Sequence, residues 1–231
     1  TGLHSSQVNS AISNILKKLD KVNLVNPRGY QILIQMLALK IYDEKRSARF
    51  APQKYLDFYE TQNEQKKINL LFYITPQENE YSGLNDETIQ TFIKRMRKLY
   101  REASTEYKII LNPVDTETIS WRNENHIKAI GTIVENLQDY SFIKSAQTDL
   151  YQLVFYRFAN AFTKVEKGQF VTPLKLIDFL VKIVNPRNEE TVIDPTVGIA
   201  DFLSFSYLNS KGTLEDTNLY GADIDDQMIM L

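Results

Sequence analysis

The segment that decides the fold is Asp194-Pro195-Thr196-Val197-Gly198-Ile199-Ala200-Asp201-Phe202. It follows a short apolar run at residues 191–193, and a helical pattern continues from it over residues 200–209. Some 20 residues later the chain reads Tyr220-Gly221-Ala222-Asp223, a second apolar run with an acidic end. A strand, a glycine turn, a helix and a strand with an acidic end are the opening order of a nucleotide-binding α/β unit.

The glycine turn has a functional and a purely structural interpretation. Gly198 offers a position without a Cβ, and the N-terminus of the next helix offers backbone donors to a bound ligand. Asp194 can accept hydrogen bonds from an ammonium group or from nearby backbone. The alternative is a plain strand-to-helix turn in which Asp194 is a local cap, because a single glycine motif matches loosely.

Asp223 also allows two interpretations. A carboxylate at the end of the second strand, at this distance from the turn, can accept hydrogen bonds from two ribose hydroxyls. Asp225 and Asp226 are more typical of caps on a following helix. Asp223 itself could instead be such a cap.

Composition excludes several classes of protein. The chain has 231 residues, 43% of them hydrophobic, so a sizeable core can form. A net charge of −2 gives no sign of nucleic-acid binding, so a basic surface would have to be local. The absence of cysteine excludes disulfides and thiolate metal sites and is compatible with the cytoplasm, the expected location. No apolar run is long enough to span a membrane, and no signal peptide is expected.

Periodicity predicts a mainly α fold with two domains, residues 1–163 and residues 164–231. The first is expected to be helical, with helices at residues 3–19, from Pro27 onward, 86–103 with Asp86 as cap, 123–137 with Asn123 as cap, and 149–162. Residues 46–85 look mixed, with Pro76 in a loop. The second domain is expected to begin with a polar linker at 164–168. It continues with a helix capped by Thr172 and begun by Pro173, a strand at 191–194, a helix at 200–209 and a strand at 218–223.

Three motifs in this order resemble the N6-adenine DNA methyltransferases, in particular the modification subunits of type I restriction–modification systems. They are G-Q-F-V-T-P at 168–173, D-P-T-V-G-I-A-D-F at 194–202 and L-Y-G-A-D-I-D at 219–225. Each is weak alone, but together they are fairly specific. The resemblance implies that the second domain is the first βαβ part of a Rossmann-like methyltransferase domain, which these residues do not complete.

The resemblance also implies a cofactor, a substrate and partners. The cofactor would be S-adenosylmethionine, bound by Gln169, Phe170, Thr172, Asp194, Gly198 and Asp223. The first three would lie near its methionine portion, and Asp223 would hold the ribose. The methyl acceptor would be an adenine swung out of double-stranded DNA. The expected partners are DNA, the specificity subunit and, as a further candidate, the restriction subunit; no membrane is expected.

Two departures from the family pattern matter. Where the family has Gly-Ser-Gly-Gly, this chain has Gly198-Ile199-Ala200-Asp201, which adds a carboxylate near the expected position of the cofactor's own. Asp201 could instead cap the helix or face the cofactor's ammonium group. The family's catalytic Asn/Asp-Pro-Pro-aromatic motif is absent, since the Asn-Pro pairs at 26, 112 and 185 continue with Arg28, Val114 and Arg187. We therefore expect no catalytic residue in this chain and no methyl transfer by it alone. The alternative function is a non-catalytic interaction or DNA-binding scaffold with a degenerate cofactor site; a methyltransferase acting on RNA or a small molecule is a third.

One helix carries a candidate nucleic-acid surface. Cationic side chains recur at helical spacing opposite its apolar face: Lys94, Arg97, Lys98 and Arg101. They can contact DNA phosphates, and the alternative is an ordinary solvated face. His4 and His126 are isolated, and no metal site is expected. The aromatic residues of 149–162 are more typical of core than of a base-stacking platform.

Overall fold

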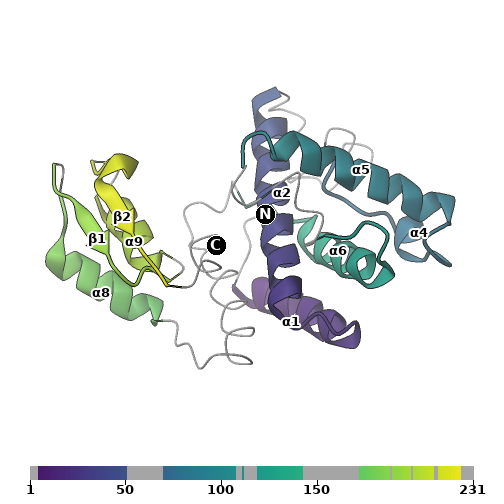
Figure 1. Ribbon diagram of the computed structural model, residues 1–231, viewed down its shortest axis with the longest axis horizontal. Coiled ribbons are helices and arrows are strands. Elements are labelled where there is room, and N and C mark those ends of the chain that lie inside the picture. Colours follow the sequence, from purple (N-terminus) through teal and green to yellow (C-terminus); the bar gives the residue numbers. More distant parts are fainter. Residues whose placement is uncertain are drawn as a thin grey trace. The chain divides into compact units, whose positions relative to one another are not determined.

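The computed structural model describes residues 5–50, 70–107, 111, 119–142, 172–187, 189–198, 200–210 and 213–224 (Figure 1). The chain divides into two compact units, residues 1–169 and residues 170–231, referred to below as unit 1 and unit 2. The domain boundary predicted at 163/164, the predicted linker and the predicted helix 149–162 lie outside the described residues.

In the part of unit 1 that the structure describes, every regular element is a helix. Its helices are α1 (Ser5–Lys21), α2 (Pro27–Phe50), α4 (Pro76–Asn79), α5 (Glu87–Ala103) and α6 (Glu124–Leu137). The predicted caps are confirmed: the Asp86 side chain accepts the N–H of Thr88, and the Asn123 side chain accepts those of Asn125 and His126. These side chains satisfy backbone donors that have no partner within the first turn of a helix.

The core of unit 1 forms where helices α1, α2, α4, α5 and α6 meet. Helix α6 packs against α1 and α2, and α5 packs against α2 and α4 (Figure 1). The side chains at these contacts are at most 1% exposed, among them Leu33, Met36, Leu37, Phe92, Met96, Ile130 and Ile133. The predicted amphipathic periodicity thus corresponds to the packing in unit 1.

Two expectations for residues 46–85 were wrong. Helix α2 continues to Phe50, beyond the start of the stretch that looked mixed. Pro76 is not in a loop but is the first residue of α4. Thr75 and Glu78 form a capping box in which each side chain accepts the other's backbone N–H, and a proline without an N–H suits the first helical position.

Three charged residues of α2 are buried and form hydrogen bonds with segments outside the helices: Lys40, Asp43 and Glu44. The Asp43 carboxylate accepts the N–H groups of Leu71 and Phe72 at 2.7 and 2.8 Å. Burial raises the pKa of Asp43, and these donors together with Arg46 oppose that rise. The Asp43 carboxylate therefore supplies hydrogen-bond acceptors to backbone N–H groups that lie outside helices and strands.

Glu44 performs the same function for the segment after α6. Its carboxylate accepts the Ser141 hydroxyl at 2.9 Å and the N–H of Phe142 at 3.1 Å. Lys40, one helical turn earlier, lies 3.1 Å from the Glu44 carboxylate and donates to the Gln138 carbonyl at 3.2 Å. Both side chains are at most 1% exposed, so the pair is fully inside unit 1.

Unit 2 contains α8 (Leu174–Val184), β1 (Val192–Asp194), α9 (Asp201–Asn209), the 3-10 turn η2 (Asp216–Asn218) and β2 (Leu219–Gly221). The strands are parallel, with Val192 opposite Leu219 and Asp194 opposite Gly221. Helix α9 contacts both strands, and α8 packs on α9 (Figure 1). The predicted order of helix, strand, helix and strand is confirmed, although both strands are shorter than expected.

The start of α8 differs from the prediction. Pro173 is the residue before the helix, not the first residue in it, because its ψ of 130° is extended and its carbonyl accepts the N–H groups of Leu176 and Ile177. Thr172 therefore lies outside the helix and is not its cap. No side-chain hydrogen bond caps α8.

Replacing Glu44 with Gln should destabilise unit 1 by about 3 kcal/mol, because it leaves the Lys40 ammonium buried beside a neutral group. Urea unfolding followed by the fluorescence of Trp121, the single tryptophan, reports on this unit. Glu124→Gln is the matched control: it breaks the exposed Lys128–Glu124 pair of 2.7 Å and should cost less than about 1 kcal/mol. Equal stability of the two variants would contradict a structural role for the buried pair.

Candidate cofactor site

The glycine turn after β1 is bonded to the acidic end of β2. The backbone N–H of Gly198 donates to Oδ2 of Asp223 at 2.8 Å, across 25 residues of sequence. Asp223 lies two residues beyond β2, and the turn lies directly beyond β1. The carboxyl ends of two parallel strands share one edge of a sheet, so the segments meet there.

Main-chain hydrogen bonds extend the pairing into the turn. The Ala222 N–H donates to the Asp194 carbonyl at 2.9 Å, and the Val197 N–H donates to the Ala222 carbonyl at 2.8 Å. The turn therefore folds back over the end of β2 instead of leaving the sheet. Residues 194–198 and 222–223 form one hydrogen-bonded structure, named the turn cluster below.

Two residues in and next to the turn have left-handed backbone. Gly198 has φ of 52°, and Ala200, the residue before α9, has φ of 61°. Glycine takes this conformation readily, whereas it costs an alanine roughly 1–2 kcal/mol. Ala200 has this conformation at a position where the resembling family has glycine, the residue that adopts it most readily.

Asp194 caps the turn locally. Its Oδ1 accepts the N–H of Thr196 at 3.0 Å, a bond within the loop. Two partners were considered for Asp194, an ammonium group and nearby backbone, and this bond is with the backbone. The carboxylate can accept several hydrogen bonds, so the local bond does not by itself exclude a ligand.

Gly221 is required by close packing beneath the turn. A Cβ at this position would lie 2.6 Å from Cγ2 of Val197 and 3.2 Å from Cδ1 of Leu203 on α9. Its own φ is ordinary, so the requirement is for space and not for conformation. Sequence reasoning missed this contact, since nothing in the sequence pairs Val197 with Gly221 before the register of the strands is known.

Asp201 is neither the cap of α9 nor a fully solvated carboxylate. Ala200 occupies the cap position, and Asp201 is the first residue of the helix. Burial raises the pKa of Asp201 to about 6. A carboxyl in this environment changes its charge within the range in which enzymes are commonly assayed.

Only some of the residues predicted to bind the cofactor lie together in the part of the chain that the structure describes. Gly198 and Asp223 are hydrogen-bonded, and Asp194 lies in the same turn cluster. Thr172 lies just before α8 and takes no part in the hydrogen bonds of the cluster. Gln169 and Phe170 lie outside the described residues.

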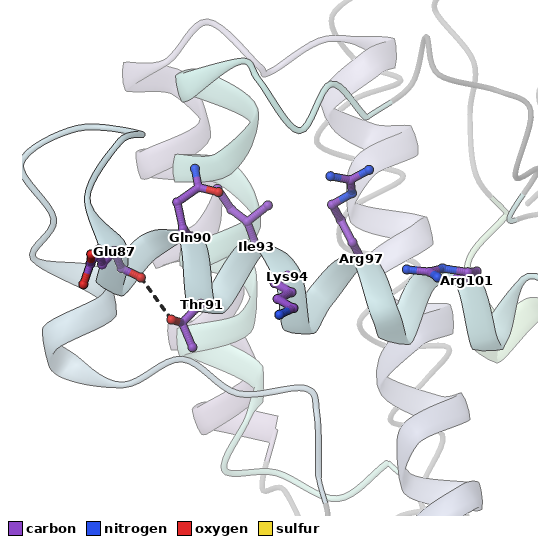
Figure 2. Close-up of a pocket in the computed structure, with 7 residues that line it drawn as sticks. All are labelled: Glu87, Gln90, Thr91, Ile93, Lys94, Arg97 and Arg101. Atoms are coloured by element: carbon purple, nitrogen blue, oxygen red, sulfur yellow. Dashed lines mark hydrogen bonds between the residues drawn. The ribbon is translucent and has the colours of Figure 1, made fainter.

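The predicted cationic helix is present in unit 1 as α5. Lys94, Arg97 and Arg101 are exposed and line a hollow in the surface (Figure 2). Lys98 is also exposed, and it lies 3.9 Å from Glu102. The apolar residues that the periodicity predicted for the other side of α5 are buried: Ile89, Phe92, Ile93, Met96 and Leu99. Ile93 also borders the hollow.

Arg95, the remaining cation in the middle of α5, has a different role. It donates to both carboxylate oxygens of Glu78, at 2.9 and 2.7 Å, and to the Tyr73 carbonyl at 2.8 Å. Its guanidinium also lies over the Tyr73 ring, 3.8 Å from the centroid. Arg95 therefore fixes α4 and the preceding segment to α5.

Within the part of the chain that the structure describes, no three His, Asp or Glu side chains are grouped so that they could hold a metal ion. No described helix is long and apolar enough to cross a membrane. His126 is buried, and its Nδ1 accepts the N–H of Ser120 at 3.0 Å. Burial lowers the pKa of His126, which is consistent with a neutral acceptor in the core.

The turn cluster lies within the region that matches a known protein family. Residues 144–231 match the family model described as N-6 DNA methylase. The resemblance inferred from the three motifs is confirmed over this part of the chain, which contains all of them.

Structural comparison agrees at the level of the fold. The chain is similar to the methyltransferase subunit of the type I restriction–modification system from Streptococcus thermophilus, with a TM-score of 0.55 and 13% sequence identity. The similarity covers 97% of this chain and 54% of that subunit, so the chain spans about half of the subunit's length. No curated protein sequence matches the chain.

Replacing Gly221 with Ala should disrupt the turn cluster, because the new Cβ overlaps Val197 and overpacking costs about 1–3 kcal/mol. Hydrogen exchange of the peptide covering residues 192–198 should become faster. Gly83→Ala is the control, since a Cβ there meets nothing within 4 Å. Unchanged exchange in the Gly221 variant would show that the strands do not hold this register.

Asp201→Asn should stabilise unit 2 at neutral pH and leave it unchanged in acid. The folded carboxyl titrates near pH 6 and the unfolded one near 3.8, so the parent's stability is complete below about pH 4 and falls as the pH rises through 6. The amide removes this loss, worth about 1–2 kcal/mol above pH 6 after allowance for solvent screening.

The measurement is hydrogen exchange of α9 in parent and variant, compared at pH 4 and at pH 7.5. Greater protection of the variant is expected only at pH 7.5. Asp216→Asn, at an exposed carboxylate of η2, is the control and should show no such difference. Equal protection of the Asp201 variant and the parent at both pH values would mean that the Asp201 carboxyl titrates normally.

Proposed function

We propose that this chain is part of a DNA adenine-N6 methyltransferase of a restriction–modification system and that its unit 2 binds S-adenosylmethionine. Unit 2 would then be the opening of a Rossmann-like methyltransferase domain. The observation that carries the proposal is the hydrogen bond between Gly198 and Asp223. It brings together the glycine turn and the acidic strand end, the two elements that a nucleoside-binding α/β unit uses.

In the proposed complex Asp223 accepts hydrogen bonds from the ribose hydroxyls. One oxygen of this carboxylate already accepts the Gly198 N–H, but a carboxylate has about four acceptor positions. The bond orients Asp223 before the ligand arrives. Asp194 and Gly198 would form the floor of the cleft, and the methionine portion would lie near Gln169, Phe170 and Thr172.

The altered turn is compatible with cofactor binding of reduced affinity. Ala200 retains the left-handed conformation, which supports a turn of the family's shape. Asp201 places a carboxyl group in the first turn of α9, near which the cofactor's own carboxylate would lie. Two anions at close range repel by about 1 kcal/mol in a solvated site, and the raised pKa of Asp201 lessens that repulsion as the pH falls toward 6.

The proposed substrate is an adenine extruded from double-stranded DNA, and the proposed partners are a specificity subunit and a restriction subunit in the cytoplasm. The sequence has no Asn/Asp-Pro-Pro-aromatic motif to orient the adenine amine. We therefore assign cofactor binding, and not methyl transfer, to these 231 residues by themselves.

The alternative is an interaction scaffold whose cofactor site has degenerated. The carboxylate of Asp201, at a position where the family has glycine, is the observation that favours it. The two functions differ in one measurable property, which is affinity for S-adenosylmethionine. Calorimetric titration with millimolar cofactor separates them, since a scaffold would release no heat of binding.

Asp223→Asn should weaken S-adenosylmethionine binding by about tenfold, because its amide lacks the charge that strengthens hydrogen bonds from ribose hydroxyls. The amide oxygen can still accept the Gly198 N–H, so hydrogen exchange of residues 192–198 should stay close to that of the parent. Asp223→Ala should lose both the binding of S-adenosylmethionine and the protection of residues 192–198 from hydrogen exchange. Asp216→Asn is the control for a lost charge in the same unit, and an equal loss of affinity there would refute the assignment of Asp223.

A further inference from the structure

Helix α5 presents cations that take no part in the fold of unit 1. Lys94, Arg97 and Arg101 are exposed and form no ion pair with any residue that the structure describes. By contrast, Arg95 is bound to Glu78, and Lys98 lies close to Glu102. Residues 88–101 contain no Asp or Glu, so the middle of the helix has no acidic side chain of its own.

Helical geometry places the three cations on one face. With 3.6 residues per turn, positions 94, 97 and 101 fall within an arc of about 60°, and they span about 10 Å along the axis. One strand of duplex DNA advances about 3.4 Å per phosphate along its axis, so the row matches roughly three phosphates. Figure 2 shows the three side chains following one another along α5.

The character of this face favours a nucleic acid over a protein partner. No large hydrophobic side chain of α5 is among the exposed ones in the described chain. The centres of protein–protein interfaces are apolar or aromatic and depleted in charge, whereas protein–DNA interfaces are polar and strongly positive. Two of the three cations are arginines, which bind phosphate through two parallel N–H groups.

We propose that Lys94, Arg97 and Arg101 form a phosphate-binding row that holds the backbone of duplex DNA without reading its sequence. The inference rests on the proposed function, because the proposed substrate is double-stranded DNA. It adds a second contact with that substrate, on unit 1, to the cofactor site of unit 2. Lys98, named with these three on sequence grounds, has Glu102 beside it and contributes less.

The test compares the 231-residue chain with a triple variant, Lys94→Gln, Arg97→Gln and Arg101→Gln. Binding of two 20-base-pair duplexes of unrelated sequence is followed by fluorescence anisotropy between 50 and 200 mM salt. The slope of log affinity against log salt concentration should become smaller in magnitude by about 2 to 3 in the variant, since each phosphate contact contributes about 0.9 to that slope. The change should be the same for both duplexes.

The control removes three exposed lysines from other helices of unit 1, with Lys17→Gln, Lys21→Gln and Lys128→Gln. It carries the same net charge as the triple variant, so a non-specific charge effect would lower both slopes equally and overturn the proposal. Absence of duplex binding by the parent at 50 mM salt would overturn it as well. The proposal would also be overturned if the triple variant lost binding to a polyglutamate peptide but kept its DNA binding. That result would assign the row to an acidic protein partner. In each case the cofactor titration would still test the proposed function separately.

Discussion

Carboxylates that accept backbone N–H groups hold together the irregular parts of both units. In unit 1, Asp43 and Glu44 accept from Leu71, Phe72 and Phe142, which lie outside the helices. In unit 2, Asp223 accepts from Gly198. A backbone donor without a partner costs free energy comparable to a lost hydrogen bond, so each of these loops depends on a distant acidic side chain. The same kind of bond thus fixes loops of one unit and the candidate cofactor site of the other.

Local signals in the sequence were enough to predict most element boundaries. Asp86 and Asn123 cap the helices that follow them, because such a cap needs only residues two or three positions away. Pro76 and Pro173 were misassigned for a related reason. Proline is suitable both for a loop and for the start of a helix, and the neighbouring hydrogen bonds decide between them.

Contacts between distant segments could not be predicted in this way. The sequence indicated that Gly198 and Asp223 lie at the ends of two strands, but not that one donates to the other. The need for glycine at position 221 depends on which residue of the turn lies above it, and that follows from the register of β1 and β2. Charges on α2 were likewise not recognised as buried, because helical spacing cannot distinguish a solvated carboxylate from one that binds a loop.

The turn also shows that a left-handed conformation does not require glycine. Ala200 keeps φ at 61° where the family pattern has glycine, and α9 still begins at the next residue. The turn is bonded to β2 through Val197 and to Asp223 through Gly198, and these bonds can offset the roughly 1–2 kcal/mol that a left-handed alanine costs. The chemical departure at Asp201 is of a different kind, since it adds a titratable group at the first residue of α9. The turn therefore combines a left-handed backbone at two positions with an added titratable carboxyl group, and the cofactor site proposed for it would differ from the family pattern in charge.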